Sequence, residues 1–203
     1  MENVGFDCIM SDSWVPLPRV EERVKVGRWA KREAKALVKM HGEPPQPGAL
    51  DQLTGDLAGW AQVSIDDMPQ IHTVLALTNV PPVGVDALGY VTAFQREETF
   101  QAPADVQRTD FDLHATERVT PRSYEEVGVP LGPGVKTFVL RRSSFNGVSS
   151  DVRNVDYFVF PNEYPDKCVV VGAYWPNPEH DEYIFGELEN MVQTLSMFVQ
   201  PEI

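Results

Sequence analysis

The sequence contains few cysteines, no long apolar run and no excess of positive charge. Cys8 and Cys168 are the only cysteines in 203 residues, too few for the disulfide framework of a small secreted protein. No stretch approaches the roughly 20 apolar residues that span a bilayer. The 17 Lys and Arg residues against 30 Asp and Glu give a net charge of −13. This balance argues against a nucleic acid or an anionic membrane as the main partner.

The N-terminal residues have neither the basic region nor the apolar region of a signal peptide. Together with the cysteine usage, this leads us to expect a cytoplasmic protein. Hydrophobic residues make up 42% and aromatic residues 10% of the chain, which excludes general disorder. A chain of this length buries about 70% of its unfolded surface on folding. We therefore predict a single domain over residues 1–203.

Motifs for a cofactor or a metal are missing. The segment Gly128–Thr137 has the glycines of a phosphate loop, but Val135 separates the last glycine from Lys136, and two prolines remove N–H donors. We expect a connection between strands there. The run Glu179–Glu182 fans out around a helix and lacks a second histidine. His72 and His114 would form a two-histidine site if they met across strands, but we predict no metal and no cofactor.

Catalytic motifs are equally missing. There is no Gly-x-Ser-x-Gly sequence, and the serine pairs 143–144 and 149–150 flank an expected hairpin turn. A dyad of Cys8 or Cys168 with His114 has no support from spacing. The acidic pairs 97–98 and 125–126 are typical of a solvated surface in an acidic chain. We therefore predict that the protein is not an enzyme.

Helical periodicity dominates the first third of the chain. It predicts one helix over residues 20–40, with Trp29 and Leu37 on its apolar side, and a second over residues 49–65. A third helix is predicted to begin after the capping residue Asn177 and to run to Pro201.

A period of two residues predicts strands in the remaining segments. The expected strands cover residues 6–14, 71–77, 85–94, 111–119, 135–142, 152–160 and 167–175. Asn146-Gly147 favours a type I′ hairpin turn between two of them. The strand over residues 167–175 is the most apolar, so we place it at the centre of the sheet. The order of elements predicts an α+β layered domain, with an antiparallel sheet of five to seven strands flanked by helices.

This order of elements resembles the PsbP-like superfamily, which includes Mog-type Ran-binding proteins and LpqN-type proteins. The likeness rests on the segment 6–14 followed by Pro16, on Val155–Pro161, on Val169–Pro176 and on the helix that contains residues 185–196. The resemblance implies an α/β/α sandwich with a mainly antiparallel sheet. It also implies a binding or assembly factor rather than an enzyme, although no lipoprotein signal of the LpqN type is visible.

Positive charge is concentrated in one segment. Residues 19–39 contain eight basic and three acidic residues, a local charge of +5 that leaves −18 on the rest of the chain. Five of the basic residues recur at intervals of three and four, opposite the apolar side of the predicted helix. They are Lys25, Arg28, Arg32, Lys35 and Lys39. They form either a solvated helix face that offsets the protein's own acids, a docking surface for an acidic partner, or a membrane-surface contact that the flanking acids oppose.

The sequence thus predicts a non-catalytic cytoplasmic binding protein, an adaptor or chaperone-like assembly factor with a protein partner. Two alternatives stay open. One is a small-molecule-binding or enzymatic domain, with a pocket between the sheet and the N-terminal helices. The other is an immunity or secretion-associated protein, which has the same sequence features as an adaptor.

Overall fold

The structure is a computed structural model that describes residues 4–19, 25–40, 47–68, 71, 73–78, 85–97, 100–112, 117–145 and 148–199. Two compact units are distinguished within the chain, where the sequence predicts one domain over residues 1–203. Unit 1 contains Met1–Met10 and Val91–Ile203, and unit 2 contains Ser11–Tyr90.

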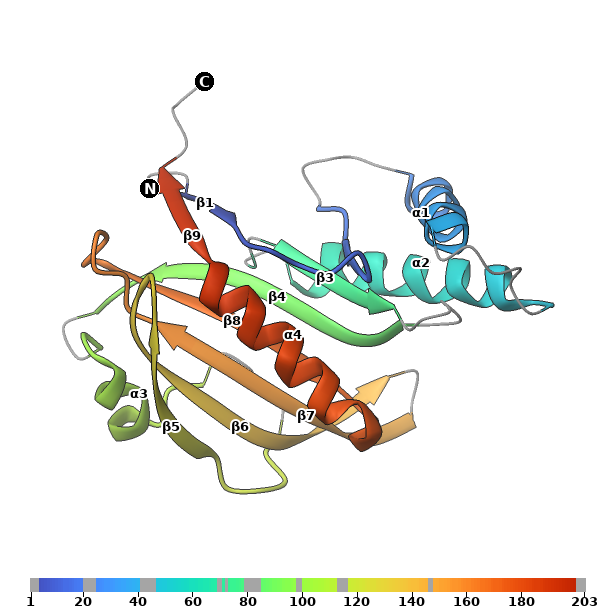
Figure 1. Ribbon diagram of the computed structural model, residues 1–203. Helices are drawn as coiled ribbons and strands as arrows, with labels where there is room; N and C mark the ends of the chain where they lie inside the picture. Colours follow the sequence, from blue (N-terminus) through green and yellow to red (C-terminus); the bar gives the residue numbers. More distant parts are fainter. Residues whose placement is uncertain are drawn as a thin grey trace. The chain divides into compact units, whose positions relative to one another are not determined.

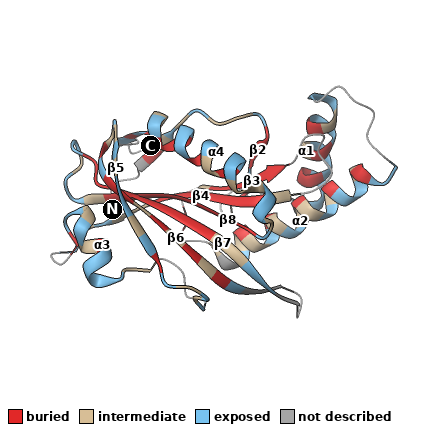
Figure 2. Ribbon diagram, turned by 60° about the horizontal axis from the view of Figure 1, so that its bottom comes forward, coloured by how far each residue is buried: buried red, intermediate tan, exposed pale blue. Residues whose placement is uncertain are grey.

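The fold is α+β, as predicted, with a seven-stranded sheet and a two-stranded sheet (Figure 1). The strand order of the larger sheet is β2-β3-β4-β8-β7-β6-β5. The pairs β2–β3, β5–β6, β6–β7 and β7–β8 are antiparallel. Strand β8 (Lys167–Trp175) is the fourth of the seven, which confirms its predicted central place. Its Val169, Val170 and Val171 are fully buried, and Figure 2 shows β4 and β8 at the centre of the sheet largely in red.

Unit 2 contains two helices and the first strands of the sheet. Helix α1 (Val26–Met40) packs against helix α2 (Ala49–Asp67). Leu53, Leu57 and Ala61 of α2 are fully buried, as their spacing predicts. Strand β2 (Trp14–Pro16) pairs with β3 (Thr73–Thr78), and β4 (Val85–Gln95) follows and continues past the boundary into unit 1.

Unit 1 contains the remaining strands and helices. Strands β5 (Ser123–Val129), β6 (Gly132–Phe145) and β7 (Val148–Val159) lead to β8. Helix α4 (Asp181–Thr194) lies across one face of this sheet (Figure 1). Helix α3 (Pro103–Thr109) is near the opposite face, on which Phe158 contacts Phe100 and Phe111. Lys136 lies 5.4 Å from the centre of the Tyr157 ring and pairs with Glu189 of α4, so Tyr157 is on the face that α4 covers. Tyr157 and Phe158 are neighbours in β7 and point in opposite directions, so α3 and α4 lie on opposite faces.

The predicted start of the last helix is confirmed, but its end is wrong. The Asn177 side chain accepts a hydrogen bond from the Glu179 N–H at 3.1 Å, and a short 3₁₀ helix (Pro178–His180) leads into α4. The helix ends at Thr194, and Ser196–Val199 form strand β9 instead. The apolar pattern of residues 195–199 suits both structures. The strand is formed because β1 (Val4–Asp7) supplies an antiparallel partner for it.

Three further predictions differ from the structure. The strand expected over residues 6–14 is divided between β1 and β2, which belong to different sheets, because a turn closed by the Trp14 N–H and the Ser11 carbonyl interrupts it. The strand expected over residues 111–119 is reduced, among its described residues, to one bridge between Arg118 and Arg141. Helix α3 and strand β5 were not predicted. The Asn146-Gly147 turn and residues 20–24 of the first predicted helix lie outside the described residues.

Candidate partner-binding surface

The five basic residues singled out in the sequence lie together on helix α1 and immediately before it. All five side chains are exposed. Lys25 precedes the helix, and its carbonyl accepts hydrogen bonds from the N–H groups of Arg28 and Trp29 at 2.9 and 3.0 Å. We call this set the basic stripe; it consists of Lys25, Arg28, Arg32, Lys35 and Lys39.

The opposite side of α1 explains why the basic stripe faces outward. Trp29, Ala30, Ala34 and Leu37 are buried, and α1 packs against α2. At 3.6 residues per turn, Ala30, Ala34 and Leu37 lie about half a turn from the basic stripe, and Trp29 lies about a quarter of a turn from it. Figure 2 shows the resulting bands of buried and exposed residues around α1. Apolar packing thus fixes the rotation of the helix and leaves the charges in solvent.

The basic stripe has little negative charge from the protein itself within reach. Arg32 forms an ion pair with its neighbour Glu33 at 2.6 Å. Within the described part of the chain, the other four members have no carboxylate partner. One interpretation of the basic stripe is that it offsets the protein's own acids. Among the described residues, the ion pair of Arg32 with the adjacent Glu33 is the one contact that supports it.

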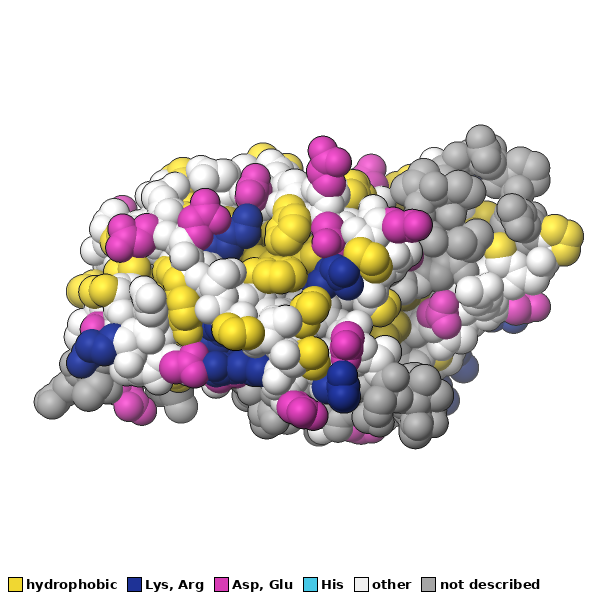
Figure 3. Space-filling model, turned by 90° about the horizontal axis from the view of Figure 1, so that it is seen from below, with side chains coloured by type: hydrophobic (Ala, Val, Ile, Leu, Met, Phe, Trp, Pro, Cys, Tyr) yellow, Lys and Arg dark blue, Asp and Glu magenta, His cyan; other side chains and the backbone are white. Residues whose placement is uncertain are grey.

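The basic residues of unit 1 are arranged differently. Unit 1 contains nine Lys and Arg residues. Eight of them have a carboxylate oxygen at 2.5–3.3 Å. The ninth, Arg96, donates to the Gln101 carbonyl at 2.7 Å and lies 5.4 Å from the centre of the Phe160 ring. Figure 3 shows basic side chains on one face bordered by acidic ones. Unengaged positive charge is therefore a property of α1 and not of the described chain in general.

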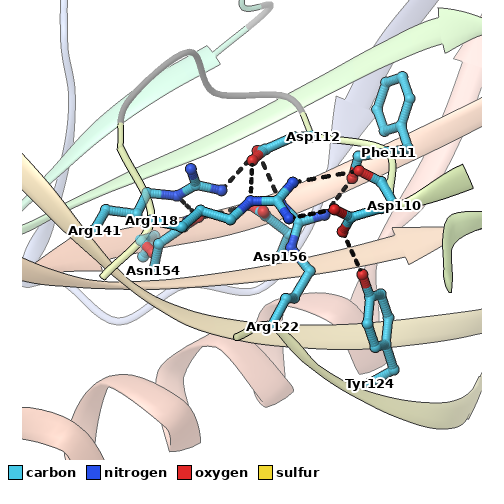
Figure 4. Close-up of polar contacts among 10 residues, drawn as sticks. Asp110, Phe111, Asp112, Arg118, Arg122, Tyr124, Arg141, Asn154 and Asp156 are labelled. Atoms are coloured by element: carbon cyan, nitrogen blue, oxygen red, sulfur yellow. Dashed lines mark hydrogen bonds and ion pairs between the residues drawn. The ribbon is translucent and has the colours of Figure 1, made fainter. Parts of the chain in front are cut away.

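The densest polar cluster of unit 1 is centred on Asp112 (Figure 4). Its carboxylate lies 2.7 Å from Arg118, 2.8 Å from Arg122 and 2.6 Å from Arg141. The side chains of Arg122 and Arg141 are 1% and 3% exposed, and that of Asp112 is 18% exposed. We call these four residues the Asp112 cluster. Buried ions of this kind lose much of their hydration, and this cost offsets most of the attraction between them. The pairing therefore adds little net stability, but the loss of one partner would leave a buried charge without a counter-ion.

The Asp112 cluster joins the chain after α3 to the sheet. Arg141 of β6 also donates to Asn154 of β7 at 2.7 Å, and Arg122 donates to the Phe111 carbonyl. Phe111 in turn stacks on Phe94, with ring centres 5.3 Å apart. The cluster therefore holds residues 110–112 and 117–122 against the face of the sheet that α4 does not cover, which is a structural role.

Asp110 forms the exposed end of this network. It accepts a hydrogen bond from the Tyr124 hydroxyl at 2.7 Å and one from Arg118 at 2.5 Å. These two contacts, that of Tyr124 first, hold the pKa of the Asp110 carboxyl below its ordinary value. Burial, and then the Asp110 carboxylate, raises the pKa of Tyr124. Both groups are therefore in their ordinary charge states at neutral pH and are poorly suited to proton transfer.

The glycine-rich segment is a connection between strands, as predicted. Strand β5 ends at Val129 and β6 begins at Gly132. A Cβ atom on Gly132 would lie 2.1 Å from the Phe160 carbonyl oxygen, so close backbone packing requires glycine there. The Lys136 amino group lies 3.3 Å from Glu189 and 4.8 Å from the centre of the Phe185 ring. Its charge is thus taken up inside unit 1.

Among the described residues, the other polar groups considered in the sequence do not form a metal or catalytic site. His72 and His114 lie outside the described residues. Among the described residues, no group of three or more His, Cys, Asp or Glu side chains could hold a metal ion. Asp181 instead accepts from the Trp175 indole N–H at 2.6 Å and pairs with Arg153 at 2.8 Å, which anchors α4 to β7 and β8.

Neither thiol has the surroundings of a nucleophile. Cys168 lies in β8, where burial raises its pKa far above the ordinary thiol value. Cys8 follows β1 outside any strand, and burial, with the nearby Asp7 carboxylate second, raises its pKa too.

A cavity of about 420 Å³ lies in unit 1, beside α3 and the turn between β5 and β6. It is lined mainly by alanine, glycine and proline, and Glu126 supplies its one titratable side chain. A single exposed carboxylate does not assemble a catalytic group. The pocket expected between the sheet and the N-terminal helices stays a prediction.

Comparison with known proteins finds a distant structural likeness but no related sequence. The sequence matches no protein-family model, and it matches no curated protein. Among solved structures, the chain is similar to the crystal structure of LpqN, a protein involved in cell envelope biogenesis of Mycobacterium tuberculosis. The two are 10% identical with a TM-score of 0.42, and the match covers 97% of this chain and 84% of LpqN. Within the described residues, no helix is long and apolar enough to cross a membrane.

Proposed function

We propose that the protein is a non-catalytic binding protein that docks an acidic segment of a protein partner on the basic stripe. One observation supports this function above others. Four of the five stripe residues have no carboxylate partner within the described residues, whereas every Lys and Arg of unit 1 is engaged. An exposed row of cations attracts a partner of opposite charge and speeds its association.

The chemistry of α1 favours an acidic protein segment over a membrane. A helix that binds a membrane surface inserts apolar side chains next to its basic ones. Trp29 and Leu37 of α1 are buried within unit 2 instead, and among the described residues Met40, at the C-terminal end of α1, is its one exposed large apolar side chain. A nucleic acid is disfavoured because the rest of the chain carries −18, which repels a polyanion longer than the helix. A short acidic segment of a protein contacts only the positive charge of the basic stripe and avoids the negative charge of the rest of the chain.

Three further parts of the proposal rest on the sequence. We assign the chain to the PsbP-like superfamily on the order of its elements, and its role to that of an adaptor or assembly factor. We infer that it is not an enzyme and uses no cofactor, because the Asp112 cluster, the densest group of polar side chains described above, serves packing. The cytoplasm is the proposed location, since two cysteines in 203 residues are typical of a protein from a reducing compartment.

The test compares two charge-reversed variants in affinity purification from the native host at low salt. Arg28→Glu with Lys35→Glu changes the basic stripe, and Arg108→Glu with Arg142→Glu makes the same change of net charge on exposed side chains of unit 1. We expect a stoichiometric partner with an acidic segment to bind the control and the unchanged protein but not the stripe variant. Circular dichroism establishes that both variants are folded. Equal binding by both variants would overturn the proposal, as would equal loss.

A further inference from the structure

The spacing of the basic stripe specifies the shape of its partner. From Lys25, the five residues follow at intervals of three, four, three and four. Over 14 residues the stripe extends about 21 Å along the helix axis, with a mean step of about 5.3 Å between charges. This is a row of regularly spaced cations along one side of α1, beginning one residue before the helix, with the exposed Lys31 beside it and no acid in it.

Only a helical partner repeats that step. A helix with Asp or Glu at the same intervals presents one carboxylate about every 5.3 Å along one side. On an extended strand, the side chains on one side recur about every 6.7 Å, so five carboxylates extend about 27 Å. That length exceeds the stripe by about 6 Å, which is more than one step. An extended acidic segment would therefore lose register with the cations.

We infer that the partner segment is an acidic helix, with carboxylates at alternating intervals of three and four, that lies along α1. The inference rests on the proposed function and adds the conformation and spacing of the ligand. An alternating interval averages 3.5 residues, so the paired rows stay in contact if the partner helix curves slightly around α1. Ala36 is an exposed small side chain beside Arg32 and Lys39, and it leaves room for the approach of the partner.

Three synthetic peptides of equal charge test the inference by fluorescence anisotropy at low salt. The first has five Glu residues at alternating intervals of three and four, and a side-chain staple on its far side keeps it helical. The second has the same composition and staple, with the Glu residues distributed around the helix. The third has the first spacing but no staple and a central proline, which prevents a helix.

We expect the first peptide to bind the full protein about eightfold more tightly than the second, since each exposed ion pair contributes about a factor of two and about three pairs are lost. Binding of all peptides should weaken in the Arg28→Glu, Lys35→Glu variant. Equal affinity of the first and second peptides would overturn the spacing inference, and tighter binding of the third would favour an extended partner. In both cases a loss of binding in the stripe variant would leave the proposed function intact. Binding that the variant does not change would overturn both.

Discussion

Removal of the Asp112 carboxylate is the sharpest test of the packing of unit 1. In Asp112→Asn, Arg122 and Arg141 keep their charges but lose their common counter-ion, and both are almost completely buried. Breaking a buried ion pair from one side costs about 3–5 kcal/mol, because a charge is left in a medium that solvates it poorly. We expect about 3 kcal/mol, the lower end, since Arg141 retains Asn154 and Arg122 retains the Phe111 carbonyl.

Urea unfolding followed by circular dichroism measures this loss. With a slope of about 2 kcal/mol per molar urea, the midpoint of unfolding should fall by about 1.5 M. Asp151→Asn is the matched control, because Asp151 pairs with Arg142 where both side chains are about half exposed. An exposed pair contributes about 0–1 kcal/mol, so the control midpoint should fall by less than about 0.5 M.

A second variant separates the lost ion pair from other effects of the substitution. Asp112→Asn combined with Arg122→Met removes a buried charge together with its counter-ion. It should recover part of the stability lost in the single variant, because the two residues are coupled. If Asp112→Asn lowered the midpoint no more than Asp151→Asn, the role assigned to the Asp112 cluster would be refuted.

Three further predictions concern single residues and their contacts. Gly132→Ala should cost about 1–3 kcal/mol through its clash with a backbone carbonyl, whereas Gly128→Ala, which has open space around it, should leave the melting temperature almost unchanged. Tyr124→Phe should raise the pKa of Asp110, observed by NMR titration, because a hydrogen bond to the carboxylate is removed. The pKa of Asp110 is lower in the folded protein than its unfolded value of about 3.9, so its contribution to the free energy of unfolding is fully present above that value. This contribution is lost as the pH falls through the folded pKa, and the Tyr124→Phe variant should lose less stability over that range than the unchanged protein. Cys168 should react with a thiol reagent only after unfolding, and rapid reaction in the native protein would contradict its burial.

Elements with a long and regular pattern could be predicted from the sequence. Helix α2 and strand β8 have the predicted positions because their apolar residues repeat over several turns or alternate positions. Helix α3 was missed because seven residues show too little periodicity, although Pro103 at its first position and Asp105 in its first turn are starting signals. Strand β9 was missed because its conformation depends on β1, nearly 190 residues away in the sequence.

The candidate site also has features that the sequence predicts and features that it does not. The exposure of the basic stripe follows from helical spacing, and the sequence was sufficient to predict it. That its charges lack partners among the described residues depends on where the other acids lie in space, which no local pattern encodes. The Asp112 cluster was missed because Arg141 of β6 lies far along the sequence from Asp112, Arg118 and Arg122, which precede β5. The one local signal is Arg141 at an inward position of a strand, two residues after the buried Val139.

The pairing of β1 with β9 has a consequence for the order in which the protein is completed. The register joins Val4 to Val199 and Asp7 to Ser196, so β1 pairs with a strand that is synthesised nearly 190 residues later. Unit 2 is continuous in sequence and lies wholly between the two segments of unit 1. All of its residues are therefore available for folding before β9 has been synthesised. Closing a loop of this length carries an entropic cost, and the pairing of β1 with β9 is thus a late step in folding.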